Sequence, residues 1–248
     1  MKIGIMDSGI GGLTVLKQCL HLLPAHEYLY YADSNNAPYG TKSKEDVYKL
    51  TEAATSFLIQ KEADIIVIAC NTATSAAATQ LRQKYDLPII GMEPAIKPAL
   101  KHAKNKRILV VATELTLKQP KFCELIDVLD ANDQVDFIGL TELVTFAEVG
   151  EFSRNIIMPF LKEKLAHFNL ELYGSVVLGC THFPLFKAFF EEVFPASTII
   201  VDGAVGTAKR VKEFVTFNST TPSIQYFLSG TPLVEGTLLE RMKAIILK

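Results

Sequence analysis

The stretch of sequence that decides the fold is Asp64-Ile65-Ile66-Val67-Ile68-Ala69-Cys70-Asn71-Thr72. It is a continuous apolar run that ends in a small residue, a cysteine and polar side chains, which is typical of a strand buried on both faces. A second stretch, Ser175-Val176-Val177-Leu178-Gly179-Cys180-Thr181-His182, has the same form. Because ligands of open α/β sheets bind at the carboxyl ends of the strands, two such strands can bring two thiols to opposite sides of one small molecule. This arrangement suits the transfer of a proton from one face of a carbon atom to the other.

Strand-like runs alternate with helical stretches along the whole chain. Strands are predicted at residues 2–6, 27–31, 64–69, 88–91, 107–112, 135–140, 175–178, 198–201 and 223–228. Helices are predicted at residues 11–23, 43–61, 74–84, 94–103, 120–129, 151–168, 185–194, 203–215 and 232–247. The second of these helices opens on a capping box, Ser43-Lys44-Glu45-Asp46. The alternation predicts an α/β fold built of βα units with mostly parallel sheets.

The likeness between the two cysteine stretches extends to the strands before them. Asp7 ends the first predicted strand and lies 63 residues before Cys70, while Thr113 follows a later strand and lies 67 residues before Cys180. The near-equal spacing predicts two halves of similar topology, each with a polar residue and a cysteine at its strand ends. The expected domains are residues 1–93 together with 206–248, and residues 94–205.

The composition is that of an ordinary soluble globular protein, and it argues against several classes of function. The chain has 248 residues, of which 49% are hydrophobic and 21% charged, and its formal net charge is -2. This charge gives no electrostatic basis for binding nucleic acid or an anionic membrane. The amino terminus lacks the apolar stretch of a signal peptide, and no apolar run approaches the roughly 18 to 20 residues that span a bilayer.

The cysteine content points to a reducing compartment. Four cysteines are too few for a disulfide scaffold in a chain of this size, and no CxxC pair of the usual zinc spacing occurs. We therefore expect a cytoplasmic protein with free thiols, and no resident metal or cofactor.

Glycines fill the first predicted strand-to-helix turn, Asp7-Ser8-Gly9-Ile10-Gly11-Gly12. Such glycines permit close backbone approach, and the following helix offers free N–H groups to an anion. A dinucleotide fingerprint would need glycine at position 14, which is Thr14, and the Gly-Lys-Ser/Thr run of a P-loop is missing. The turn is therefore expected to hold a carboxylate or an amino group, with Asp7 suited to an ammonium partner. A tight turn without a ligand is the alternative.

Cys70 and Cys180 are the strongest candidates for chemistry, because they are paired and polar side chains follow each directly. A free thiol with a pKa of about 8.5 costs about 2 kcal/mol to ionise at pH 7. A helix N-terminus returns roughly 0.3–1 kcal/mol, and His182 or a substrate ammonium is expected to close the remaining gap. One thiolate and one thiol can then act as base and acid, with the roles exchanged in the reverse direction. Cys19 and Cys123 lie in helical patterns and are interpreted as core residues.

Taken together, these residues resemble the glutamate racemases, a family of cofactor-independent amino-acid racemases. The resemblance runs along nearly the whole chain and is carried by five ordered motifs: Asp7-Ser8-Gly9-Ile10-Gly11-Gly12, Pro38-Tyr39-Gly40, Ala69-Cys70-Asn71-Thr72-Ala73, Glu93-Pro94-Ala95 and Gly179-Cys180-Thr181-His182-Phe183-Pro184. It implies interconversion of L- and D-glutamate, which supplies D-glutamate for bacterial peptidoglycan. It also implies two flavodoxin-like three-layer α/β/α domains related by pseudo-symmetry, with the active site between them, often in a homodimer.

The resemblance also implies roles for individual residues. Cys70 looks like the thiol that takes the proton from D-glutamate, and Cys180 like the partner that takes it from L-glutamate. Asp7 and His182 resemble the auxiliary acid–base residues, and Glu148 falls where the family has an assisting carboxylate. The positions implied to contact substrate are Asp7, Ser8, Pro38, Tyr39, Gly40, Asn71, Thr72, Thr113, Thr181 and His182.

Two segments depart from the family pattern. Leu115 stands where glycine is usual, in the turn after the strand at 107–112. Residues 144–147 differ from the usual Pro-Leu-Val run that precedes the assisting carboxylate. Considered without the resemblance, Glu148 is more typical of a helix-capping or solvated residue.

Other interpretations stay open from the sequence. One is a regulatory role such as inhibition of a DNA topoisomerase, which is known for some family members, although nothing in this chain is basic enough to indicate it. Three more follow from the residues. The nearest is a racemase of another acidic amino acid such as aspartate, although His182 and the Pro38-Tyr39-Gly40 loop favour glutamate. Another is a non-catalytic amino-acid-binding protein with two similar halves, for which both thiols would be dispensable. The third is a metal site made of Cys70, Cys180 and His182, for which no fourth ligand is evident.

Overall fold

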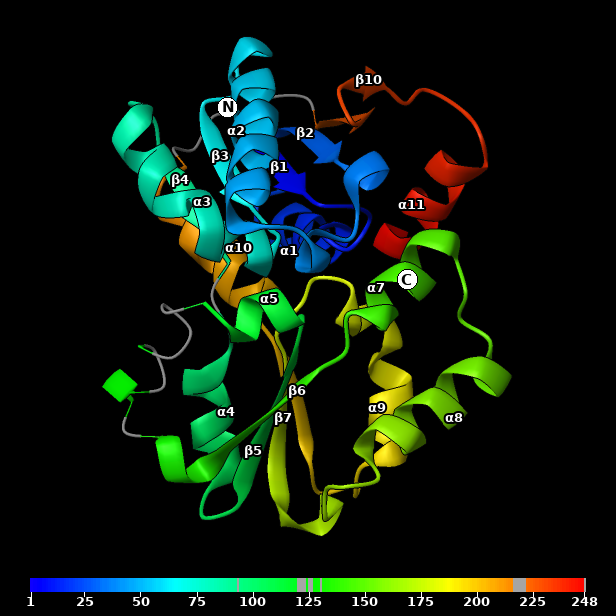
Figure 1. Ribbon diagram of the computed structural model, residues 1–248. Helices are drawn as coiled ribbons and strands as arrows, with labels where there is room; N and C mark the ends of the chain where they lie inside the picture. The colour runs from blue at the N-terminus through cyan, green and yellow to red at the C-terminus, as the bar shows by residue number, and fades with distance from the viewer. Residues whose placement is uncertain (93, 120–123, 125–126, 130, 216–221, 248) are drawn as a thin grey trace.

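The computed structural model describes residues 1–92, 94–119, 124, 127–129, 131–215 and 222–247. Within these residues the chain forms two sheets with helices on both faces, and Figure 1 shows one sheet above the other. The predicted helix at 120–129 falls largely outside the described residues. Glu93 and Cys123 lie wholly outside them.

The first sheet has six strands in the order β10-β9-β2-β1-β3-β4. All neighbouring strands are parallel except β9 and β10, which pair antiparallel. The bounds are Lys2–Asp7 for β1, Glu27–Ala32 for β2, Ile65–Ile68 for β3, Ile89–Gly91 for β4, Ser223–Leu228 for β9 and Thr231–Pro232 for β10. The chain thus returns to its first sheet near its end.

The second sheet has four parallel strands in the order β6-β5-β7-β8. Their bounds are Arg107–Ala112 for β5, Val135–Gly139 for β6, Tyr173–Leu178 for β7 and Ile199–Asp202 for β8. This order repeats the order β2-β1-β3-β4 within the first sheet, so the two halves share one topology, as the spacing of the motifs predicted. Cys70 follows β3, and Cys180 follows the equivalent strand β7.

Helices cover both faces of each sheet and complete three layers in each half. On the first sheet, α1 (Leu13–Leu22), α10 (Ala204–Lys212) and α11 (Thr237–Leu247) pack on one face, and α2 (Lys44–Gln60) and α3 (Asn71–Lys84) on the other. On the second sheet, α4 (Ile96–Ala103) packs on one face, and α7 (Glu142–Val149), α8 (Arg154–Leu165) and α9 (Lys187–Val193) on the other. A further helix, α5 (Glu114–Leu117), follows β5. Among the described helices, none has the length and apolar character needed to cross a bilayer.

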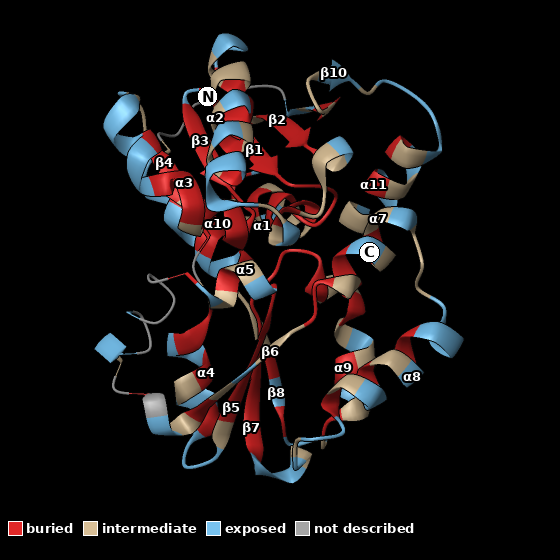
Figure 2. Cartoon of the chain, viewed as in Figure 1, coloured by how far each residue is buried: buried red, intermediate tan, exposed pale blue. Residues whose placement is uncertain are grey.

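The strands that precede the two cysteines are buried on both faces. Every residue of β3 and of β7 is buried, and Figure 2 shows the central strands buried in both halves. In β3, Ile65 and Val67 belong to the core cluster under α1, whereas Ile66 and Ile68 belong to the cluster under α2 and α3. Continuous apolar runs are the pattern expected of parallel strands covered on both sides.

Several elements differ from their predictions, and helices α5 and α7 were not predicted at all. Helix α3 begins at Asn71, three residues earlier than expected, because Cys70 is its N-cap and the thiol accepts a bond from the amide of Ala73. Helix α7 was not predicted; at eight residues it is too short to be stable alone and depends on packing. The closing helix α11 begins at Thr237, because residues 231–232 pair with β9 instead. The division into domains at 93/94 and 205/206 stays a prediction.

Two glycines give a paired test of this packing. A Cβ at Gly174, in β7, would lie 2.7 Å from the main-chain oxygen of Ala103, whereas a Cβ at Gly206, in α10, would have no neighbour within 4 Å. We expect Gly174→Ala to lower the free energy of unfolding by about 1–3 kcal/mol, because two backbones must separate. We expect Gly206→Ala to raise it by roughly 0.5–1 kcal/mol, since alanine is the better helix former. Urea unfolding followed by circular dichroism measures both, and a Gly174→Ala variant as stable as the parent would contradict the close approach.

Candidate active site

The two cysteines lie at the ends of equivalent strands, one in each half, near the junction of the two. Cys70 caps the N-terminus of α3 in the first half, and Cys180 lies two residues after β7 in the second. Both are buried, with exposed fractions of 4% and 8%. Burial raises the pKa of Cys70 to about 12, and the charges of Asp7 and Cys180 add to this rise. Because Cys180 contributes, the two thiols are close enough to interact electrostatically. The predicted convergence of the two strand ends is therefore present.

Asp7 joins the first half to the second at the end of β1. Its carboxylate is fully buried and accepts hydrogen bonds from the Gly9 amide at 3.1 Å and from the Thr181 hydroxyl at 3.0 Å. Burial, partly opposed by the positive charge of His182, raises the pKa of Asp7 to about 6. An acid with this pKa is mostly ionised at neutral pH and can change its protonation state near it.

His182 connects the second thiol to a carboxylate. Its Nδ1 lies 3.8 Å from the sulfur of Cys180, and its Nε2 lies 2.7 Å from a carboxylate oxygen of Glu148. Burial alone would lower the pKa of this imidazole, but its bonds to Cys180 and Glu148 outweigh burial and raise the pKa well above 6.5. These two contacts favour the protonated form of the ring. It approaches the glycine turn closely, since a Cβ at Gly11 would lie 2.4 Å from Nδ1.

Glu148 is neither solvated nor a helix cap; it lies in the last turn of α7 with a side chain that is 14% exposed. Besides His182, its carboxylate accepts bonds of 2.7 Å from the amide of Ile10 and from the hydroxyl of Ser34. Burial opposes ionisation, but these partners, His182 above all, hold the pKa of Glu148 below its usual range. The position implied by the family resemblance is therefore part of the site, and Ser34 is a partner that the sequence did not indicate.

Three threonine hydroxyls form a second contact between the halves. Thr72 Oγ1, at the start of α3, lies 3.0 Å from the hydroxyls of both Thr113 and Thr116, which lie 2.9 Å from each other. Thr116 was not among the predicted residues, and its spacing from Thr113 is the only signal that could have indicated it. Leu115, between them, packs against the core cluster of the first half.

Asn71 presents a free acceptor in this region. Its side-chain oxygen is buried and has no hydrogen-bond partner among the described residues. Buried polar groups are nearly always paired, so an unpaired amide oxygen at a junction marks a place for a ligand donor. Asn71 and Ser8, which also lies buried there, suit a small polar ligand.

The Pro38-Tyr39-Gly40 loop lies against the second half. A Cβ at Gly40 would lie 2.7 Å from Thr113 Cβ, so the loop touches the hydroxyl cluster. The hydroxyl of Tyr39 donates a 2.6 Å bond to Asp33, and Asp33 in turn accepts a 2.8 Å bond from Ser229 after β9. Asp33 was not singled out from the sequence, although it orients a residue that was.

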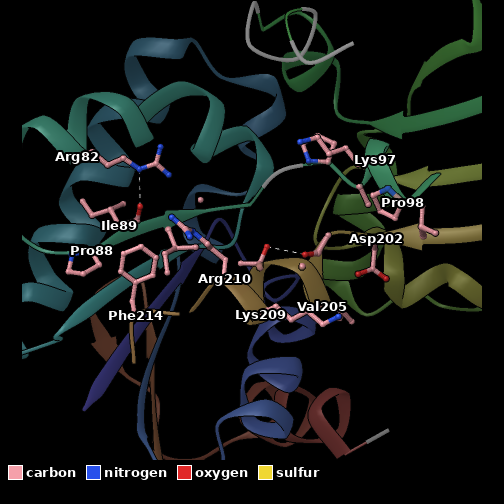
Figure 3. A pocket seen from close by; sticks show the side chains of 18 of the residues that line it. Arg82, Pro88, Ile89, Lys97, Pro98, Asp202, Val205, Lys209, Arg210 and Phe214 are labelled. Atoms are coloured by element: carbon pink, nitrogen blue, oxygen red, sulfur yellow. Dashed lines mark hydrogen bonds between the residues drawn. The ribbon is translucent and has the colours of Figure 1, made fainter. Parts of the chain in front are cut away.

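A large cleft lies away from the two cysteines. It has a volume of about 1220 Å³, and neither cysteine lines it. Figure 3 shows its wall, with Arg210 beside Phe214 on one side, Lys97, Pro98 and Asp202 on the other, and Arg82 bonded to the carbonyl of Ile89. In the part of the chain that the structure describes, no three His, Cys, Asp or Glu residues are arranged to hold a metal ion.

The arrangement is suited to moving a proton across one carbon atom. It offers two thiols with different partners, an imidazolium next to Cys180 and a buried acid near Cys70. The ionisation of Cys70 is harder than the sequence suggested: with a pKa of about 12, the thiolate costs about 7 kcal/mol at pH 7. The earlier value of about 2 kcal/mol left out burial, which is the largest cause of the shift.

Comparison with known proteins gives a consistent result at the sequence level. The family described as Asp/Glu/Hydantoin racemase matches residues 3–211. A glutamate racemase of Halothermothrix orenii is 47% identical over 236 residues, which cover 93% of each chain. Glutamate racemase 2 of Bacillus subtilis is 45% identical over 251 residues, which cover 99% of this chain and 95% of the relative.

Solved structures give the same result. Glutamate racemase from Francisella tularensis in complex with D-glutamate superposes with a TM-score of 0.84 at 25% identity, covering 100% of this chain and 94% of that one. Escherichia coli glutamate racemase in complex with L-glutamate and the activator UDP-MurNAc-ala superposes with a TM-score of 0.80 at 28% identity, covering 94% and 99%.

The buried acid at the junction has a measurable effect on stability. Because folding raises the pKa of Asp7 from 3.8 to about 6, the folded state holds this proton more tightly than the unfolded state. The free energy of unfolding therefore falls as the pH rises from about 4 to above 6, in total by about 3 kcal/mol for this group. We expect Asp7→Asn to melt at a higher temperature than the parent at pH 8, and the difference to vanish near pH 4. Thermal denaturation from pH 4 to 8 tests this, with the exposed Asp86→Asn as control; a difference independent of pH would contradict it.

Proposed function

Since the chain belongs to the Asp/Glu/hydantoin racemase family and matches glutamate racemases along almost its whole length, we propose that Cys70 and Cys180 transfer the α-proton of glutamate on opposite faces. Glutamate racemase activity itself follows from relatives that are 43–48% identical over most of the chain. The finer proposal, a two-thiol mechanism, rests on the geometry of this junction.

The observation that carries the proposal is the delivery of one thiol by each half. The two halves repeat one strand order, and each places its cysteine after the equivalent strand. A planar carbanion between two such thiols can lose a proton to one and regain it from the other. An enzyme with a single base could not return the proton to the opposite face without turning the intermediate over.

On the Cys180 side, the neighbouring imidazole is placed to exchange a proton with the thiol. Its Nδ1 lies 3.8 Å from the sulfur of Cys180, and its Nε2 is bonded to Glu148. We propose that the Cys180 thiolate removes the α-proton of L-glutamate and becomes a thiol. Cys70 then gives its proton to the opposite face and becomes a thiolate, which yields D-glutamate.

On the Cys70 side, the thiol is an acid ready to donate. Its high pKa keeps it protonated while the site is empty. In the reverse direction it must act as a base, and we propose that the substrate ammonium near Asp7 lowers that barrier. The amide of Ala73, 3.4 Å from the sulfur, adds a hydrogen bond that stabilises the thiolate.

The weakly acidic α-hydrogen requires the site to stabilise a carbanion without a cofactor. We propose that Ser8, Asn71, Thr72 and Thr181 surround the glutamate and that their donors take up the charge that develops on the α-carboxylate. All four residues are buried at the junction, so little water competes for these bonds. Thr113, in contact with Thr72, completes the polar wall.

The biological role is a further part of the proposal. D-Glutamate produced by this reaction would serve peptidoglycan synthesis, and the enzyme would act in the cytoplasm, as a homodimer in common with many members of the family. The substrate test is direct: purified protein is given L-glutamate or L-aspartate, and the appearance of the opposite enantiomer is measured. Turnover of L-aspartate alone would reject the proposal, as would binding of glutamate without turnover.

Removal of either thiol is expected to abolish racemisation. We expect Cys70→Ser and Cys180→Ser to lower kcat/KM by on the order of 10²–10⁴-fold or more, because each removes a group that transfers a proton. In deuterated water the parent should place deuterium at the α-carbon of the product. The matched control is Cys19→Ala, whose thiol lies in the core under α1. Near-parental turnover by either serine variant would refute the two-thiol mechanism.

Loss of the carboxylate beside His182 should shift the pH profile. The bonds from Glu148 and Cys180 raise the pKa of His182 against burial, so Glu148→Gln should lower this pKa. The imidazolium is then lost at a lower pH, and the alkaline limb of kcat/KM against pH should move to lower pH. Glu142→Gln, on the same helix but paired with Lys164, is the control and should leave the limb in place. An unshifted limb in Glu148→Gln would show that this carboxylate does not set the protonation of His182.

A further inference from the structure

The C-terminal helix α11 reaches the active site through one side chain, Arg241. Its Nη2 donates a 2.6 Å hydrogen bond to the main-chain oxygen of Glu148, whose carboxylate binds His182. Helix α11 is anchored in the core of the first half by Leu239 and Met242, whereas α7 belongs to the core of the second. The bond therefore joins the two halves, and it contacts Glu148 through the main chain.

The guanidinium lies at the C-terminal end of α7. Carbonyls at this end of a helix have no partner within the helix, and a cation there is favoured by the helix dipole. Helix α7 stops at Gly150, which has a left-handed φ of 79°. A Cβ at Gly150 would lie 2.5 Å from Arg241 Nη1, so the approach of Arg241 depends on glycine at this position.

Glu148 is thus held at two points. Its carboxylate is fixed by Ile10, Ser34 and His182, and its main chain by Arg241. The first three groups, together with burial, are the main determinants of the acidity of Glu148. Arg241 is therefore expected to act through the position of the carboxylate rather than through its charge.

We propose that Arg241 is a positioning residue that keeps Glu148 against His182 and thereby supports proton transfer at Cys180 more than at Cys70. This inference rests on the proposed two-thiol function. His182 contacts Cys180 directly, whereas Cys70 takes its bond from the amide of Ala73 and is linked to Glu148 only through Asp7, so displacement of Glu148 acts more directly on the transfer at Cys180.

The unequal effect of Arg241 on the two proton transfers is measured through isotope effects. The two enantiomers of glutamate are equal in free energy, so any variant changes kcat/KM by the same factor in both directions. The isotope effect on kcat/KM, in contrast, reports which transfer limits the rate. When the step at Cys180 becomes slower, the effect rises for α-deuterated L-glutamate and falls for α-deuterated D-glutamate.

The experiment compares the full-length parent with Arg241→Met, Arg241→Lys and Lys243→Met. Lys243 is the matched control, since it lies on the same helix and pairs at the surface with Glu240. We expect Arg241→Met to lower kcat/KM by about 10- to 100-fold, as for a displaced catalytic group. The isotope effect should rise for α-deuterated L-glutamate and fall for α-deuterated D-glutamate. Arg241→Lys should restore part of both, and Lys243→Met should match the parent. Isotope effects do not depend on the amount of folded enzyme, so a partly unfolded variant still gives a result.

Two outcomes would overturn the inference alone: parental kinetics in Arg241→Met, or a lower kcat/KM with isotope effects unchanged or shifted in the opposite sense. The first would show that Arg241 is dispensable. The second would show that it supports the fold, or the other transfer. A parent protein that does not racemise glutamate would overturn the proposed function, and this inference with it.

Discussion

The rest of the structure depends on the hydrogen bonds that buried ionisable side chains make at the junction of the two halves. Asp7 and His182 are buried almost completely and Glu148 largely so, and they come from both halves. Water cannot solvate them, so their bonds to each other and to Thr181, Ile10 and Ser34 stabilise them instead. The bonds of Asp7 to Thr181 and of Glu148 to Ile10 and Ser34 exist only while the halves are in contact. The same groups therefore close the interface and create the acidities that the chemistry needs.

The repeated strand order places two equivalent thiols, but it does not give them equivalent surroundings. Cys180 has the ring of His182 beside it and, behind that ring, the carboxylate of Glu148. Cys70 caps a helix N-terminus, but burial above all, together with the charge of Asp7, keeps its thiol protonated. The two thiols therefore have different partners for their protons, which a symmetric site would not provide.

Most of the fold could be predicted from the sequence, because long apolar runs separated by turn residues have few alternative structures. The strands that end at Cys70 and Cys180 lie within a residue or two of their expected bounds. Helix α7 could not be predicted, since its eight residues carry a signal too short to distinguish from a loop. Among site residues, Asp33, Ser34 and Thr116 were missed because their partners lie in other elements. The pKa of Cys70 was misjudged for a similar reason, since burial depends on the whole assembly.

The late return of the chain to its first sheet has a consequence for synthesis on the ribosome. Strand β2 pairs with β9 along residues 27–32 and 223–228, so one edge of β2 stays open until nearly the whole chain has been made. The four-stranded sheet, in contrast, has all of its strands once residue 202 has left the ribosome. The Ser229 bond to Asp33 and the Arg241 bond to Glu148 form later still. A nascent chain therefore carries both cysteines well before it can complete the contacts around them.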